Sequence, residues 1–129
     1  MNDLTRLLND LAAAPVLDEP VLREITGAAG MTPLELVDMF VDDFNANLTL
    51  MRDALPATNR EVFNRSAHSL KSSAGNVGAQ RLAMLAAALE KGTKYELDPD
   101  ISVLVNQLET AFTDFCHHIE THRVPLSVG

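Results

Sequence analysis

The spacing of apolar side chains is the feature that most constrains how this 129-residue chain can fold. Nearly all of the spacing is helical, with apolar residues recurring every three or four positions. The strict alternation of apolar and polar residues that indicates a β-strand occurs nowhere at useful length. The sequence shows neither an internal repeat nor a low-complexity tract. It therefore predicts an all-α protein.

Two short helices are predicted at the start of the chain. The first carries leucines at helical spacing and loses this pattern toward Pro15. The second begins with Asp18 as its N-cap and is ended by Gly27 and Gly30.

Four longer helices follow, each with a start or stop signal. Thr32 and Thr58 each open a capping box, with a glutamate three residues later, and Asp98 before a proline predicts the start of the last helix. Pro125 is expected to stop that helix. The predicted segments are residues 32–56, 58–78, 82–92 and 98–125.

Short connections make consecutive helices antiparallel neighbours, and one apolar stripe per helix requires a shared core. We therefore predict an antiparallel up-down four-helix bundle with one or two short N-terminal helices. Residues 1–129 are expected to form a single domain. Within it, residues 1–15 form the added N-terminal helix, residues 16–123 the bundle and residues 124–129 a tail.

The charge and composition exclude several classes of partner. Ten Lys and Arg against 18 Asp and Glu give a net charge of −8, which disfavours binding to nucleic acid or to an anionic membrane. Aromatic residues are only 5% of the chain and Trp is absent, so bases have few surfaces to stack on. One cysteine, no secretory leader and no long apolar run favour a cytoplasmic protein. A monomer is expected, because the bundle can bury its own stripes.

One histidine is predicted to stand on the outer face of the fourth helix. At about 100° per residue, the apolar residues of segment 58–78 lie on the side of the helix opposite His68. The residues within about 60° of His68 are polar or small. Among them are Asn64, Arg65, Lys71, Ser72 and Gly75.

This group of residues favours phosphoryl chemistry. An unprotonated imidazole is a competent nucleophile near neutral pH, and a phosphoryl group placed on His68 could be stabilised by Lys71, with help from Arg65. Ser72 and Gly75 would let the backbone of another protein approach closely. The alternative interpretation is a solvated surface histidine with ordinary surface charges, beside small residues that serve packing or helix bending.

Residues 67–79 read AHSLKSSAGNVGA and are followed by Leu82 and by the pair Leu89 and Glu90. This stretch closely resembles the motif of histidine-containing phosphotransfer (HPt) domains, which lies on the second helix of an antiparallel four-helix bundle. The helix order matches over about residues 16–122, and the specific signal lies in residues 67–78.

The resemblance implies that His68 accepts a phosphoryl group from the aspartyl phosphate of a receiver domain and passes it to another receiver domain. Lys71 matches the lysine that supports the phosphoryl group, and Gly75 matches the small residue beside the histidine. Ser72 stands where some members have glycine. Glu90 stands where several have glutamine, and a carboxylate close to the histidine would disfavour the phosphoryl group. The role of Glu90 is left open, and the favoured interpretation is an ordinary polar residue of its helix that pairs with Lys71 or Lys94.

The resemblance also implies which partners and cofactors to expect. The partners are response-regulator receiver domains and a hybrid sensor histidine kinase. The receiver domain supplies the acidic pocket and Mg²⁺, so this chain is expected to hold no cofactor and to have no catalytic activity of its own. Two alternatives stay open: a helical docking bundle that is never phosphorylated, and the phosphoacceptor fragment of a larger hybrid sensor kinase. The start at Met1 and the short segment after Pro125 favour a free-standing protein.

A second cluster near the C-terminus offers a metal-binding alternative. It contains Cys116, His117, His118 and His122, and the last two are four residues apart on one helix face. Cys116 is about 200° from His118 around the helix, and no further acidic or thiol ligands are spaced to complete a site. The favoured interpretation is therefore a helix end with histidines near the negative end of the helix dipole, and no metal.

Overall fold

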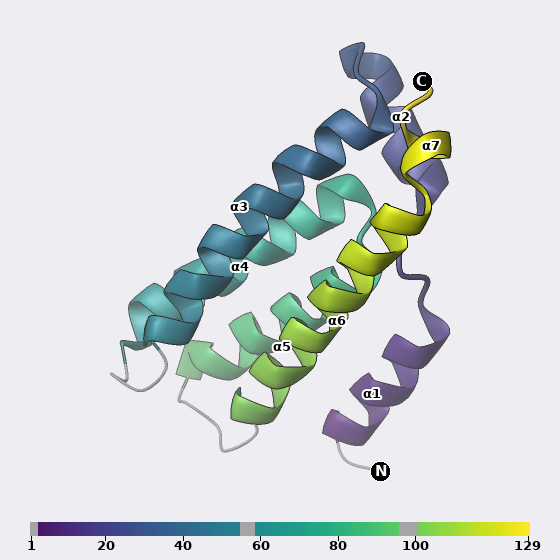
Figure 1. Ribbon diagram of the computed structural model, residues 1–129. Helices are drawn as coiled ribbons and strands as arrows, with labels where there is room; N and C mark the ends of the chain where they lie inside the picture. The colour runs from purple at the N-terminus through teal and green to yellow at the C-terminus, as the bar shows by residue number, and fades with distance from the viewer. Residues whose placement is uncertain (1–2, 55–58, 96–100) are drawn as a thin grey trace.

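The computed structural model describes residues 3–54, 59–95 and 101–129 (Figure 1). These residues form seven α-helices and include no β-strand. The helices are α1 (Asp3–Ala13), α2 (Glu19–Ala29), α3 (Pro33–Ala54), α4 (Arg60–Val77), α5 (Gln80–Tyr95), α6 (Ile101–Thr121) and α7 (Arg123–Leu126). Among these helices none is long and apolar enough to cross a membrane.

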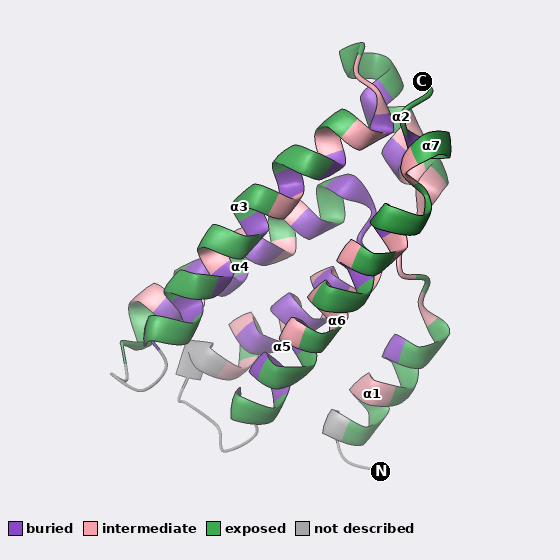
Figure 2. Ribbon diagram, in the orientation of Figure 1, coloured by how far each residue is buried: buried purple, intermediate pink, exposed green. Residues whose placement is uncertain are grey.

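The four long helices α3 to α6 form the bundle, which confirms the predicted fold class. Helix α4 packs against both α3 and α5, and α5 packs against α6. Their apolar stripes face one another in the interior (Figure 2). Phe40 of α3 contacts Phe115 of α6 edge to face, with ring centroids 5.4 Å apart, so the first and last helices of the bundle meet through aromatic rings.

Side-chain caps fix where several helices begin. Asp18 caps α2, and its carboxylate accepts from the backbone N–H of Val21. The Thr32 hydroxyl accepts from the backbone N–H of Glu35 at the start of α3. At α4 the N-cap is Asn59, whose side chain accepts from the N–H of Val62. The predicted cap Thr58 lies outside the described residues.

The predicted stops at Gly27 and Gly92 were wrong, whereas the stop at Gly30 is confirmed. Helix α2 runs through Gly27 to Ala29, and its C-cap is Gly30, which takes the left-handed conformation with φ of 70°. Helix α5 runs through Gly92 to Tyr95. A side chain at Gly92 would lie 3.1 Å from Cδ1 of Ile101, so this glycine gives α6 room to pack rather than ending α5. The predicted start at Asp98 lies outside the described residues.

The C-terminal segment is folded, whereas a tail after residue 123 was predicted. Helix α6 ends at Thr121, and Pro125 lies inside the short helix α7. Proline is tolerated there because the N–H groups of a first helical turn have no partner within the helix. Leu126 is fully buried, and the Arg23 guanidinium donates to the carbonyl oxygens of Pro125 and Val128 at 3.0 and 2.9 Å.

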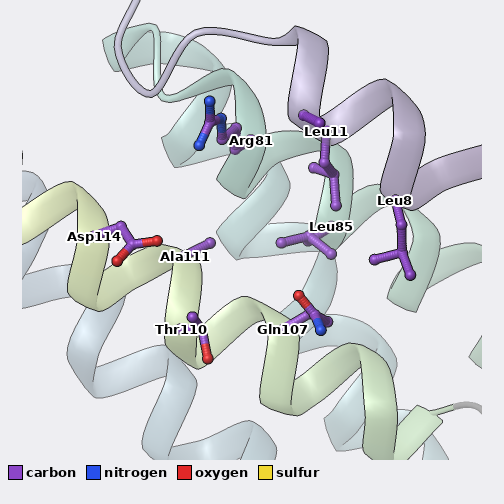
Figure 3. Close-up of a pocket in the computed structure, with 9 residues that line it drawn as sticks. Leu8, Leu11, Arg81, Leu85, Gln107, Thr110, Ala111 and Asp114 are labelled. Atoms are coloured by element: carbon purple, nitrogen blue, oxygen red, sulfur yellow. The ribbon is translucent and has the colours of Figure 1, made fainter.

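Helix α1 lies beside α5 and α6, outside the four-helix core (Figure 1). Leu8 and Leu11 of α1 line a cavity of about 200 Å³ together with Leu85 of α5 and residues of α6 (Figure 3). The Arg81 side chain donates to the backbone carbonyl of Ala14 at 2.7 Å. The segment that follows α1 is thereby attached to the start of α5.

Candidate functional site

His68 lies in the middle of α4 and points away from the core, as predicted. Its side chain is 60% exposed, whereas Ala67 and Leu70 beside it on the same helix are fully buried. The histidine is therefore held by a helix whose other face is fixed in the bundle interior. Most of the imidazole is open to solvent.

The C-terminal end of α4 is fixed by a close contact with the segment before α2. Gly78 takes φ of 79°, and its carbonyl oxygen accepts from the backbone N–H of Asp18 at 2.7 Å. A Cβ at Gly78 would lie 2.6 Å from the carbonyl oxygen of Asp18, so the approach requires glycine. Gln80 donates to the Asp18 carboxylate at 2.8 Å and strengthens the same junction.

Glu90 of α5 reaches across to α4 and contacts two of the predicted site residues. One carboxylate oxygen bonds to Nδ1 of His68, and the other accepts from Nζ of Lys71 at 2.5 Å. The Glu90 side chain is only 22% exposed. Asn64 donates its side-chain amide to the backbone carbonyl of Glu90 at 2.8 Å. The site is therefore built from two helices.

The neighbours of Glu90 hold its carboxyl group in the ionised form. The pKa of Glu90 is lowered, chiefly by the hydrogen bond from Lys71 and further by the bond to His68, while burial opposes the shift. An ionised carboxylate can only accept hydrogen bonds, so Nδ1 of His68 must be the donor in their contact. In a neutral imidazole this leaves the lone pair on Nε2, the second ring nitrogen.

The remaining predicted site residues lie on the same face but do not contact the imidazole in any described interaction. Arg65 is 69% exposed and pairs with Glu61, with 3.0 Å between nitrogen and oxygen. Ser72 is exposed. Gly75 is exposed too, and a Cβ added there would meet no atom of this chain within 4 Å. Packing inside the chain therefore does not require glycine at position 75.

Sequence reasoning left the place of Glu90 undecided, and the structure puts it at the centre of the cluster. The helical spacing of the segment after Gly78 predicts which side of α5 is buried. It does not predict how α5 is rotated against α4, and therefore not which of its residues lies next to His68. Of the two lysines named as partners, Lys71 makes the contact. The side chain of Lys94 lies outside the described residues.

The C-terminal histidines make a different arrangement. The rings of His118 and His122 stack with centroids 4.1 Å apart, and Nδ1 of His122 bonds to the backbone carbonyl of His118 at 2.7 Å. The pKa of His118 is lowered by burial and by the neighbouring His122. In the described parts of the chain, no group of three or more His, Cys, Asp and Glu is placed to hold a metal ion.

The site lies within a segment that matches a known family. The Hpt domain family matches residues 35–116, which is more than half of the chain and includes both α4 and α5. The chain belongs to the Hpt domain family. This Hpt domain is a histidine phosphotransfer carrier of a phosphorelay.

A solved structure supports the same assignment. The Hpt domain is 28% identical to histidine-containing phosphotransfer protein B (HptB) of Pseudomonas aeruginosa PAO1, with a TM-score of 0.80. The match covers 87% of this chain and 97% of that one. A comparison with curated proteins gives no significant match. Members of the family work with receiver domains and kinases in phosphorelays.

Proposed function

We propose that His68 is the phosphoacceptor of this Hpt domain. The observation that carries the proposal is the pairing of Nδ1 of His68 with Glu90 on an otherwise exposed imidazole. This pairing leaves Nε2 as the nucleophile, on the side of the ring that faces away from Glu90. Residue 68 also lies inside the matched family segment.

The transfer step balances in atoms and charge. The Nε2 lone pair of His68 forms the N–P bond, and the bond between phosphorus and the aspartyl oxygen of the receiver breaks, leaving a carboxylate. Nδ1 keeps its proton throughout. Onward transfer reverses these events at the aspartate of a second receiver domain.

Lys71 is proposed to stabilise the phosphoryl group. Its ammonium group is one helical turn from His68 on the same face, and it is already held at the site by Glu90. Arg65 is on the other side of His68 along α4, and its pair with Glu61 is an exposed i,i+4 contact that a phosphoryl group can replace. Both residues would supply positive charge to the product.

The face around His68 is proposed as the docking surface for receiver domains. Asn64, Ser72 and Gly75 border the imidazole and add little bulk. The open space around Gly75 lets a partner backbone lie close to α4. The partners proposed are receiver domains of response regulators and of a hybrid sensor histidine kinase.

The proposed carrier has no catalytic activity of its own. The receiver domain supplies the acidic groups and the Mg²⁺ for transfer, and the Hpt domain binds no cofactor. We further propose that it acts as a cytoplasmic monomer and binds neither nucleic acid nor membranes, in keeping with its net charge of −8.

Transfer of radiolabel from an aspartyl-phosphorylated receiver domain with Mg²⁺ tests the proposal. Label should move to the Hpt domain, survive alkali and be lost in acid. His68→Gln should abolish labelling, and His117→Gln, an exposed histidine on α6, should not. Labelling retained in folded His68→Gln would disprove the assignment of the phosphoacceptor. Binding to receivers without any transfer would favour a docking bundle instead.

A further inference from the structure

Both oxygens of the Glu90 carboxylate are committed to α4 in the unphosphorylated protein. One bonds to the imidazole of His68 and the other to the ammonium of Lys71. The Lys71 ammonium has three N–H donors, and before any transfer at least one of them is directed at Glu90. It is engaged with a carboxylate that shares the charge sign of the phosphoryl group.

Phosphorylation changes the charge that Glu90 faces. The imidazole that attacks phosphorus is the neutral form, because the attack needs the lone pair on Nε2. Afterwards the ring, with Nδ1 still protonated, carries one positive charge, and the phosphoryl group carries up to two negative charges. The ring is nearer to the carboxylate, while the phosphoryl group has about twice the charge, so attraction and repulsion at Glu90 largely offset each other.

The interaction that does not cancel is the one with Lys71. A lysine ammonium that turns toward the phosphoryl group weakens its contact with Glu90, and one that stays with Glu90 gives less to the phosphoryl group. In the unphosphorylated protein Nζ of Lys71 lies 2.5 Å from the Glu90 carboxylate, which is only 22% exposed, so this ion pair favours the state in which Lys71 stays with Glu90. The same hydrogen bond is the main cause of the lowered pKa of Glu90.

We propose that Glu90 competes with the phosphoryl group for Lys71 and thereby sets the phosphoryl-transfer potential of His68 in favour of donation. The inference rests on the proposed role of His68. Glu90 acts through Lys71 and through the Nδ1 proton, so it is a positioning residue.

The same carboxylate also eases the onward step. When an aspartate of the next receiver attacks phosphorus, the N–P bond breaks and its electron pair returns to Nε2. Because Glu90 holds the proton on Nδ1, the leaving group is a neutral imidazole rather than an imidazolate. A site that binds the phosphoryl group weakly and releases it readily is suited to pass it on rather than store it.

The test is the equilibrium of phosphoryl exchange between the Hpt domain and an isolated receiver domain phosphorylated with acetyl phosphate and Mg²⁺. Glu90→Gln keeps the shape and removes the charge. It should raise the ratio of phosphorylated to free Hpt domain by roughly threefold to tenfold at a fixed receiver ratio. It should also slow onward transfer. Glu109→Gln is the matched control, because Glu109 is a partly buried carboxylate paired with Arg52 between α3 and α6.

A double-mutant cycle separates this role from a structural one. If Glu90 acts through Lys71, Glu90→Gln should change the exchange ratio by less than about twofold in a Lys71→Ala background. Nitrogen NMR shifts of the His68 ring should show the Nδ1–H tautomer in the wild type and a mixture in Glu90→Gln. An unchanged or lowered ratio in folded Glu90→Gln would overturn the inference, as would an undiminished effect without Lys71.

The two proposals fail in different ways. Labelling of folded His68→Gln would remove the phosphoacceptor assignment and this inference with it. Loss of labelling in His68→Gln, with an exchange ratio in Glu90→Gln equal to that of the wild type, would overturn only the role of Glu90.

Discussion

The side-chain amide of Asn64 donates a hydrogen bond to the backbone carbonyl oxygen of Glu90, with 2.8 Å between the two atoms. This contact joins α4 to α5 at the residue whose carboxylate then turns back to His68 and Lys71. The rotation of α5 against α4 is thus fixed next to the imidazole by a bond to the main chain. Side-chain chemistry at position 90 can change while this bond is kept.

Asn64→Ala should therefore weaken both the fold and the site. Loss of one partly buried hydrogen bond should cost about 1 kcal/mol, which lowers Tm by about 4 °C in a chain of this size. Phosphoryl transfer should slow several-fold, because the Glu90 backbone is no longer held in place by Asn64 and its carboxylate is positioned less well. Thermal unfolding and transfer kinetics measure both effects. Asn106→Ala, on an exposed position of α6, is the control and should change neither.

Gly78→Ala should destabilise the junction of α4 with the segment before α2. Alanine at position 78 would have to take a left-handed backbone conformation, and its Cβ would lie 2.6 Å from the Asp18 carbonyl oxygen. We therefore expect the unfolding free energy to fall by about 3 kcal/mol. Gly30→Ala shares the positive φ but meets no atom within 4 Å, and should cost about 1 kcal/mol. The difference between the unfolding free energies of the two variants, measured with denaturant, gives the cost of the close contact with Asp18. Equal losses would contradict the close approach at Gly78.

Gly75→Leu should block docking and leave the fold intact. The position is exposed, and the first side-chain atom would meet nothing in this chain, so Tm should stay the same or rise slightly. A bulky side chain beside His68 should slow transfer from a receiver domain by about tenfold. Gly27→Leu, at an exposed helical glycine of α2, should leave transfer unchanged. A Gly75→Leu variant with normal kinetics would place the docking surface elsewhere.

Acid titration should reveal the Glu90 network in the unphosphorylated protein. The pKa of Glu90 in the folded state lies below its ordinary value of 4.5, chiefly because Lys71 donates to it. Its contribution to stability is therefore fully present above pH 4.5 and is lost as the pH falls through the lowered pKa. The difference in unfolding free energy between wild type and Glu90→Gln should shrink in that range. A difference that stays constant down to complete acid unfolding would contradict this.

Leu126→Ala should show that the C-terminal segment is part of the fold. Leu126 is fully buried, so truncation should cost about 2–3 kcal/mol and lower Tm by about 10 °C. Phosphoryl transfer measured well below that Tm should be unchanged. Val124→Ala, in the same short helix but 79% exposed, is the control and should have little effect. Equal Tm values for the two variants would support the tail that was predicted from the sequence.

The bundle and the exposed face of α4 could be predicted because both depend on local signals. An apolar residue every three or four positions gives the buried side of each helix, and the outer position of His68 follows from it. Asp18 and Thr32 cap their helices as expected, because a side-chain oxygen beside the first free N–H groups acts within a few residues.

The place of Glu90 and the fold of the C-terminus could not be predicted, because they depend on contacts distant in the sequence. Glu90 meets residues 19 and 22 positions away, and the contact requires the rotation of α5 that Asn64 helps to set. Pro125 indicated a stop, yet Arg23, more than 100 positions earlier, holds the carbonyl groups around it. Helical periodicity carries no information about such pairs.

Helix α5 serves two sides of the molecule. Glu90 faces α4, whereas Leu85, five residues earlier and about 140° away around the helix, lines the cavity beneath α1. A handle attached to the exposed side of α1 would therefore leave the imidazole open to a receiver domain. The chain can be anchored to a surface or joined to a reporter there. Phosphorylated and unphosphorylated receiver domains can then be passed in turn over the same immobilised molecules, so that the rates of acceptance and of donation are measured separately.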